Sequence, residues 1–337
     1  MSADRARGAL LGLAVGDALG TTLEFERPVA PAFPNFATGP HREVTGGGPF
    51  ELRPGQVTDD TQMACCLAAS LREHRRFVQS DVARRYAEWW PLAFDVGSQT
   101  EAALSSVSKD ANEAGRAVWL ARGRQAAGNG SLMRTAPIGV FFAGDPTARL
   151  LASLADSAIT HYDPRCQLAC AALNAALSAA LGGASARDAR IRAGAELEPA
   201  ADLATSRRPD DTDQIRAAAA SLRSDLEAAD RDDPELYGPD LHLHRHEGFV
   251  RVAFRLAFWE AVHAPTFEAG LIDVVNRGGD ADTNGAIAGS LLGALHGEPS
   301  IPERWRRTVL DALQDGPPGP WRDQYHPLAL LELTAGA

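Results

Sequence analysis

Two short acidic segments hold the residue types in this 337-residue chain that are best suited to chemistry. Residues 57–62 read VTDDTQ and residues 278–284 read GGDADTN, so each segment combines carboxylates with a threonine hydroxyl. Carboxylates at this density repel one another unless a cation lies among them. The candidate ligands are oxygen atoms, which selects Mg²⁺, Mn²⁺ or Ca²⁺ over zinc or copper. We therefore predict a shared cation site with the ligands Thr58, Asp59, Asp60, Asp280, Asp282 and Thr283.

The number of carboxylates bears on the number of ions. Four carboxylates exceed what one Mg²⁺ requires, and they suit two ions roughly 3.5–4 Å apart. Two ions can bind vicinal hydroxyls or polarise a water molecule, and a carboxylate such as Glu24 could then transfer the proton. The alternative is ordinary helix capping, with Thr58 as the N-cap and Asp59 and Asp60 in the first turn, where the helix dipole favours anions. Capping explains one acidic residue more easily than the whole Thr-Asp-Asp-Thr sequence.

The apolar pattern predicts a mostly α-helical chain in which each acidic segment begins a helix. There is no internal repeat and no clear domain boundary, so we expect a single domain over residues 1–337. Residues 183–245 are polar and variable in pattern, and we expect them to be partly helical. Helices are predicted at 4–20, 58–74, 80–90, 147–158, 164–182, 247–262, 284–297, 301–314 and 325–334.

Glycines recur at every fourth residue in two of the predicted helices. They are Gly8, Gly12, Gly16 and Gly20 in the first helix, and Gly285, Gly289, Gly293 and Gly297 in the second. This spacing places each set in one row along a helix surface. Because a glycine costs a helix roughly 1 kcal/mol relative to alanine, four in register indicate that another backbone approaches closely. We predict that both helices pack deep in the core, with each other as candidate partners; simple tolerance of glycine is the alternative.

Segments between the helices carry further candidate site residues. Residues 21–57 are rich in proline and glycine and include Glu24, and an irregular segment of this length is usually functional. Residues 128–134 read GNGSLMR, and their backbone N–H groups could hold a phosphate, although Asn-Gly is also a common turn. His161 lies in a short polar segment, where a purely structural role is the alternative to a site role.

The composition limits the classes of partner and compartment. A net charge of −11 makes nucleic acid an unsuitable general partner, because phosphate binding needs a basic surface. No run of about 18 apolar residues is present, so no membrane span is predicted. The apolar run at 8–20 is interrupted by Asp17 and is not followed by an ordinary cleavage region, so we expect a cytoplasmic protein.

The four cysteines lack zinc spacing and are expected as small buried side chains in a reduced setting. His242, His244 and His246 alternate as ligands on a strand would, but their surroundings favour a solvated loop.

Taken together in their order along the chain, these motifs resemble the ADP-ribosylglycohydrolase family. That family includes the dinitrogenase-reductase-activating glycohydrolases and the vertebrate ADP-ribosyl-acceptor hydrolases. The resemblance spans roughly residues 8–297, most of the chain, and implies a single all-α domain with a binuclear Mg²⁺ or Mn²⁺ site at helix N-termini. Residues 183–245 have no match in the family. We interpret them as a variable helical insertion within a domain core that spans residues 4–300. The matching stretches are 8–20, 57–61, 95–97, 128–134, 160–161 and 278–284.

The resemblance also implies roles for individual residues. The six oxygen ligands named above match the family's two-metal site, and Glu24 matches a mobile glutamate in a flap over that site. Asp95 matches an acidic residue near the scissile bond, and Gly97 lies beside it in the same motif. His161 matches a histidine that contacts substrate. The turn that would cradle the diphosphate and distal ribose contains Asn129, Gly130, Ser131 and Met133.

The function implied is that of a metal-dependent hydrolase that cleaves the bond between the anomeric carbon of ADP-ribose and an acceptor, with Glu24, Asp59 and Asp95 as catalytic residues. Arginine-linked ADP-ribose is the first choice of substrate, because residues 16–25 look more like the nitrogenase-regulating branch. The alternatives are serine-linked ADP-ribose, O-acetyl-ADP-ribose, a non-catalytic ADP-ribose-binding module and an unrelated Mg²⁺ phosphohydrolase. We expect a monomer that acts on an ADP-ribosylated protein or a small ADP-ribose conjugate.

Overall fold

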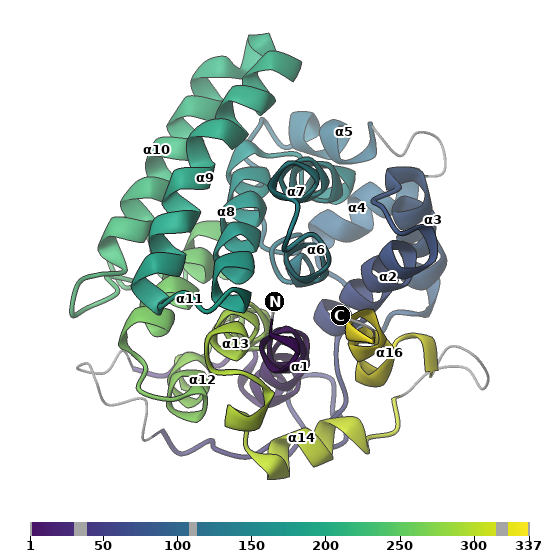
Figure 1. Cartoon of the computed structure of the whole chain (residues 1–337), viewed down its shortest axis with the longest axis vertical. Coiled ribbons are helices and arrows are strands. Elements are labelled where there is room, and N and C mark those ends of the chain that lie inside the picture. The colour runs from purple at the N-terminus through teal and green to yellow at the C-terminus, as the bar shows by residue number, and fades with distance from the viewer. Residues whose placement is uncertain (1, 30–38, 108–112, 315–322, 336–337) are drawn as a thin grey trace.

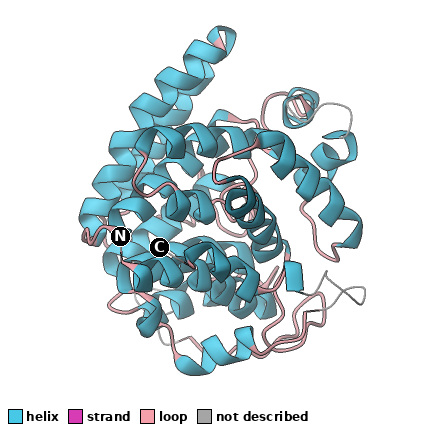
Figure 2. Ribbon diagram, turned by 45° about the vertical axis from the view of Figure 1, so that its right-hand side comes forward, coloured by secondary structure: helices cyan, strands magenta, loops and turns pink. Residues whose placement is uncertain are grey.

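The computed structural model describes residues 2–29, 39–107, 113–314 and 323–335, and helices dominate it (Figure 1). Within these ranges β structure is limited to isolated bridges, and loops connect the helices (Figure 2). The predicted all-α, single-domain fold is confirmed. The helices are α1 (Ala3–Gly20), α2 (Asp59–His74), α3 (Gln79–Trp89), α4 (Ser98–Val107), α5 (Ala114–Ala121), α6 (Ala136–Phe141), α7 (Pro146–Thr160), α8 (Pro164–Leu181), α9 (Ala186–Arg207), α10 (Thr212–Ala228), α11 (Val250–His263), α12 (Phe267–Asn276), α13 (Ala281–His296), α14 (Glu303–Leu310) and α16 (Pro327–Leu331).

Helices α1 and α13 lie side by side at the centre of the molecule and pack through their glycine rows (Figure 1). A Cβ atom built on any of the four α1 glycines would lie 2.0–2.3 Å from a carbonyl oxygen of α13. No side chain larger than hydrogen fits at this distance, so the predicted close approach is confirmed. The facing residues are Gly8 with Gly293, Gly12 with Gly289, Gly16 with Gly285, and Gly20 with Ala281.

The pairing is antiparallel, so the C-terminal end of α1 lies against the N-terminal end of α13. The contact between Gly20 and Ala281 therefore brings the segment after α1 beside the second acidic segment. Gly297 is an exception to the predicted row. It follows α13 with a φ of 82°, a backbone conformation suited to glycine at a helix C-terminus.

The last predicted helices are shorter than expected. The helix predicted at 301–314 ends at Leu310, because the chain turns back toward α2. There the Gln314 side chain accepts a hydrogen bond from Val57 N–H and donates one to the Gly55 carbonyl. The helix predicted at 325–334 is the short α16, which begins with Pro327 and is followed by a 3-10 turn. The residues after α14 thus fix the entry into the first acidic segment.

Helices α9 and α10 come from the segment without a family match. They lie side by side along α8 at one flank of the molecule, with the loop 229–249 returning the chain to α11 (Figure 1). The partial helix predicted at 183–245 is therefore confirmed, and its status as a variable insertion stays a prediction. No helix in the described ranges is long and apolar enough to span a membrane. The four cysteines are free and buried, as predicted.

Candidate functional site

The carboxylate of Asp17 caps α2 from the neighbouring helix α1. It accepts hydrogen bonds from the backbone N–H groups of Thr58 and Thr61, at 3.0–3.1 Å, and from both threonine hydroxyls. Thr58 occupies the N-cap position, but its own side chain makes no capping bond. The positions given by the capping alternative are confirmed, with Thr58 as the N-cap and Asp59 and Asp60 in the first turn, but the capping hydrogen bonds come from Asp17. Asp17 satisfies the helix N-terminus, which leaves Asp59 and Asp60 for another purpose.

The second acidic segment reaches Glu24 through a two-glycine turn. Gly278 and Gly279 both have a φ of 67°, and a Cβ atom at Gly278 would lie 2.3 Å from the Glu26 carbonyl oxygen. Gly279 N–H donates to that carbonyl, and Phe25 N–H donates to the carbonyl of Gly279, both at 2.7 Å. These two bonds fix the backbone on the C-terminal side of Glu24. The glycines are thus required by the close approach of the two chain segments.

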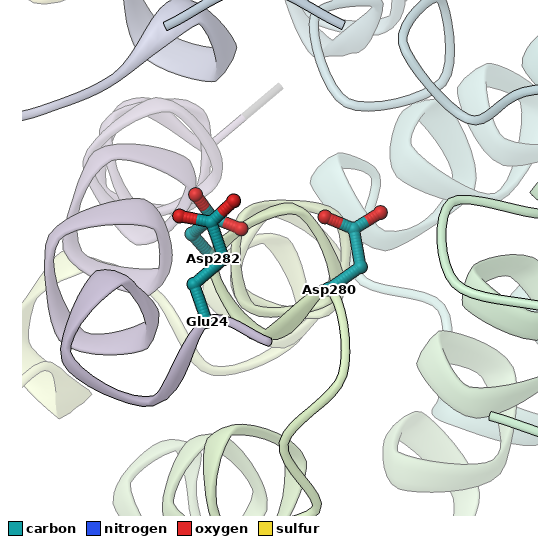
Figure 3. A group of neighbouring side chains, drawn as sticks. All are labelled: Glu24, Asp280 and Asp282. Atoms are coloured by element: carbon teal, nitrogen blue, oxygen red, sulfur yellow. The ribbon is translucent and has the colours of Figure 1, made fainter. Parts of the chain in front are cut away.

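Glu24, Asp280 and Asp282 form one cluster. Each offers a carboxylate oxygen that lies within 4.8 Å of the others. Figure 3 shows the Glu24 carboxylate reaching that of Asp282 from the segment after α1, with Asp280 on the adjoining turn before α13. Asp60 joins this cluster through Thr283, whose hydroxyl donates to the Asp60 carboxylate at 3.3 Å. The structure therefore brings the two predicted acidic segments together.

The electrostatics of this cluster fit a bound cation. Burial, followed by the charge of neighbouring carboxylates, raises the pKa of Asp59, Asp60 and Asp282 well above the usual range. Burial and the charges of Asp95 and Asp280 raise the pKa of Glu24 to about 9. Asp60 Oδ1 and Glu24 Oε2 are buried and have no hydrogen-bond partner in the described structure. Unpaired buried carboxylate oxygens are costly, and a hard divalent cation would satisfy them.

A cavity of about 740 Å³ opens onto the cluster. Asn129 connects the carboxylates to the rest of the cavity, since its side-chain amide donates to Asp280 at 2.6 Å. The cavity wall also carries the basic side chains of Arg122 and Arg165, with His161 and His246. Of the predicted site residues, those that line it are Glu24, Asp59, Asp95, Gly97, Asn129, Gly130, Met133, His161, Asp280, Asp282 and Thr283.

Three predicted site residues lie behind the cavity wall. Thr58 and Asp60 are fully buried, and the Thr58 hydroxyl donates to Asp60 at 3.1 Å. The Ser131 hydroxyl contacts that of Ser157 at 2.9 Å, within the core. Any contact of Ser131 with a ligand in the cavity would therefore be made by its backbone.

The 128–134 turn leaves backbone donors free. Asn129 N–H is bonded to the Gly248 carbonyl, and Gly128 N–H to the Gln99 side chain. The N–H groups of Gly130 and Ser131 have no hydrogen-bond partner among the described residues. Free adjacent N–H groups are suited to an anion.

Comparison with known proteins agrees with this architecture. The family model for ADP-ribosylglycohydrolase matches residues 1–336. The chain belongs to the ADP-ribosylglycohydrolase family. This membership confirms the expected enzyme class. Among its relatives, the ADP-ribosyl-[dinitrogen reductase] glycohydrolase of Rhodospirillum rubrum is 32% identical over 90% of this chain and 89% of its own length.

Two further similarities cover most of the chain. The ADP-ribosylarginine hydrolase Tri1 of Pseudomonas putida (strain GB-1) is 31% identical over 91% of this chain and 74% of its own. A solved structure titled "ADP-ribosylglycohydrolase-related protein complex" is 31% identical, with a TM-score of 0.71 and 98% coverage of both chains.

Sequence reasoning missed several residues of the site in this ADP-ribosylglycohydrolase. Asp17 could have been found, because it is the one charged residue in an otherwise apolar helix run. Arg122 and Arg165 carry no sequence signal, since each lies at an ordinary helix end. His246 was assigned to a solvated loop, yet it lines the cavity with Glu247.

Proposed function

We propose that this chain removes ADP-ribose from arginine side chains of modified proteins by metal-dependent hydrolysis of the N-glycosidic bond. The observation that carries the proposal is one cavity that joins a buried carboxylate cluster to free backbone N–H groups and two arginines. ADP-ribose has the matching chemistry, with vicinal hydroxyls next to the scissile bond and a diphosphate farther along. The names of both relatives described above concern ADP-ribosylated targets, and one specifies arginine.

Two Mg²⁺ or Mn²⁺ ions would be held by Thr58, Asp59, Asp60, Asp280, Asp282 and Thr283. When bound, such ions stabilise negative charge on ribose hydroxyls as the transition state forms. The unpaired oxygens of Asp60 and Glu24 support this assignment, because they need a positive partner that the described protein does not supply.

The diphosphate would bind at the 128–134 turn. The free N–H groups of Gly130 and Ser131 are suited to phosphate oxygens, and Arg122 and Arg165 add positive charge to the same cavity. Met133 and Gly97 also line it and would contact the distal ribose or the acceptor side.

Hydrolysis forms a bond between a water oxygen and the anomeric carbon and breaks the bond from that carbon to the guanidine nitrogen. The electron pair of the broken bond goes to the nitrogen, and one proton of the water goes to a carboxylate. Glu24 and Asp95 are the candidates for proton transfer to the leaving group and from the water. Asp59 lines the same cavity as Asp95 and would orient the water.

A substrate comparison tests the proposed linkage. The full chain is incubated with arginine-linked, serine-linked and O-acetyl-ADP-ribose, each with Mg²⁺, Mn²⁺ or EDTA, and free ADP-ribose is measured. We expect release from the arginine conjugate with metal and none with EDTA. Release from the serine or O-acetyl conjugate alone would overturn the arginine assignment. Binding of ADP-ribose without turnover of any substrate would indicate a non-catalytic module.

A pair of variants tests the metal site separately. Asp282→Asn removes a charge from the cluster with little change in volume, and Asp210→Asn removes a charge at an exposed position that does not line the cavity. We expect Mn²⁺ to raise the thermal midpoint of the wild type and of Asp210→Asn, and to leave that of Asp282→Asn nearly unchanged. Equal Mn²⁺ stabilisation of all three proteins would contradict the assigned ligands.

A further inference from the structure

Arg134 is a fully buried arginine beneath the cavity that none of the steps above uses. Its Nε donates to the Asp156 carboxylate at 3.2 Å, and one terminal nitrogen donates to the Asp156 carbonyl at 3.1 Å. The other terminal nitrogen donates to the Gly130 carbonyl at 3.0 Å and to Thr160 Oγ1 at 2.9 Å. Tyr86 completes the arrangement, since its hydroxyl donates to Asp156 and its ring lies 4.5 Å from the guanidinium carbon. Arg134 is therefore rigidly held on all sides.

The contact with Arg134 fixes the direction of the hydrogen bonds that the Thr160 hydroxyl makes. A guanidinium has donors only, so the Thr160 hydroxyl must accept from Arg134. The hydroxyl proton then points elsewhere, and the other hydrogen-bond partner of Oγ1 among the described residues is His161 Nδ1, at 2.8 Å. Thr160 thus donates to Nδ1, which must be the unprotonated ring nitrogen.

The remaining ring nitrogen of His161 faces the cavity. His161 lines the cavity, and its Nε2 lies 3.1 Å from the position that a Cβ atom on Gly130 would occupy. Nε2 has no hydrogen-bond partner in the described ranges. The backbone is fixed, since His161 N–H donates to the Ser157 carbonyl at 2.7 Å and the Ser157 hydroxyl donates to the His161 carbonyl. The ring therefore presents one nitrogen to a ligand.

We propose that Arg134 and Thr160 fix His161 as the neutral tautomer with its proton on Nε2, so that it can only donate a hydrogen bond to the ligand. Arg134 and Thr160 are positioning residues, since neither lines the cavity. The donor lies beside the free Gly130 N–H, and together they select a ligand oxygen that accepts hydrogen bonds. The identity of that oxygen as part of a diphosphate rests on the proposed function, whereas the tautomer does not.

The charge state of His161 agrees with this arrangement. Burial, with the positive charges of Arg134 and Arg122, lowers the pKa of His161 well below its usual range. The opposite neutral tautomer would place a proton on Nδ1 and leave the buried Thr160 hydroxyl proton without an acceptor, which is unfavourable. Only the proposed tautomer gives a hydrogen-bond partner to both the Thr160 hydroxyl proton and His161 Nδ1.

Nitrogen NMR on the full chain tests the tautomer directly. The protein is labelled with ¹⁵N on the rings of its nine histidines, and His161→Gln identifies the His161 signals by their loss. We expect wild-type His161 to show a protonated Nε2 and an unprotonated Nδ1, unchanged between about pH 6 and 8. A protonated Nδ1, or a ring that titrates in this interval, would overturn the proposal.

Three variants test the role of Thr160. Thr160→Val removes the hydroxyl and keeps the shape, Thr160→Ser restores the hydroxyl, and Thr135→Val removes another fully buried hydroxyl, one that is bonded to Asn174. We expect Thr160→Val to produce a mixture of the two His161 tautomers, and the other two variants to retain the wild-type ring signals. An unchanged tautomer in Thr160→Val would contradict the role given to Thr160.

Ligand binding connects the tautomer to function. With ADP-ribose as the probe, we expect about a tenfold increase in Kd for Thr160→Val, with rescue by Thr160→Ser and none of this loss in Thr135→Val. An equal loss in Thr135→Val would show a merely structural effect and overturn the positioning role. Lack of ADP-ribose binding by the wild type, with the expected tautomer present, would refute the proposed function and leave the tautomer standing.

Discussion

Replacing Gly16 with alanine tests whether the α1–α13 contact holds the fold together. A Cβ atom at this position would lie 2.0 Å from the carbonyl oxygen of Gly285, and 2.8 Å from the nitrogen of Ala286. These neighbours are backbone atoms of a buried helix, so they cannot rotate away as a flexible side chain would. The two helices would have to separate locally by at least about 1 Å, because carbon and oxygen atoms do not approach closer than about 3 Å.

The expected cost follows from two opposing effects. Alanine favours a helix over glycine by roughly 1 kcal/mol, whereas overpacking a buried site costs about 1–3 kcal/mol and occasionally more. Because the clash is with backbone, we expect an overpacking cost near the top of that range, about 3 kcal/mol, which leaves a net destabilisation of about 2 kcal/mol after the gain in helix propensity. For a chain of this size that lowers the thermal midpoint by roughly 3 °C.

Gly194→Ala is the matched control, because Gly194 also lies inside a helix, α9. A Cβ atom there would meet Leu226 Cδ1 at 3.7 Å, which is an ordinary contact. We expect this variant to gain up to about 1 kcal/mol in the free energy of unfolding. Circular dichroism melts and urea titrations of both variants give the comparison. Shifts of the same sign in the two variants would refute the reasoning, because helix propensity alone would then explain both.

Three more outcomes can be measured. Asp17→Asn weakens the acceptor that caps α2, and we expect a loss of about 1–2 kcal/mol in urea titrations together with weaker Mn²⁺ binding in calorimetry. Burial and nearby carboxylates raise the pKa of Asp95 to about 7 and that of Glu24 to about 9. The contribution of these two carboxyl groups to the free energy of unfolding is therefore complete below about pH 4, where both are protonated, and is lost as the pH rises. The thermal midpoint in EDTA should therefore fall between about pH 5 and 9, and Mg²⁺ should reduce the fall; a midpoint that rises over this interval would contradict the sign. Burial and Asp273 also raise the pKa of Glu260, so Glu260→Gln should reduce the pH dependence of the melt, and an unchanged slope would exclude Glu260 as a contributor.

The close pairing of α1 and α13 could be predicted because its cause is local in sequence. A glycine at every fourth position costs helix stability, and only a close neighbouring backbone can offset that cost. Two such rows in one chain therefore indicate that the two helices pack against each other. The same argument could not give the register. In the structure Gly20 lies against Ala281, and Gly297 follows the end of α13 outside the glycine row. This register follows from the connections and packing of the whole chain.

The acidic residues of the site were predictable for a similar reason, since Asp59, Asp60, Asp280 and Asp282 lie close together within each segment. Arg122, Arg165 and His246 were not, because each reaches the cavity from a different element and has unremarkable neighbours in sequence. Their convergence depends on how α5, α8 and the loop before α11 pack. A basic side chain at a helix end is usually solvated, so its type alone indicates nothing.

The glycine contact and the carboxylate cluster are two parts of one arrangement. The antiparallel pairing brings the end of α1 against the start of α13, and that end carries both Asp17 and the approach to Glu24. The carboxylates gathered there repel one another and are buried, so on their own they favour separation of the helices. The glycine rows oppose this separation along the length of both helices. The packing therefore opposes the repulsion within the cluster, and any variant that loosens the glycine contact should weaken cation binding as well as stability.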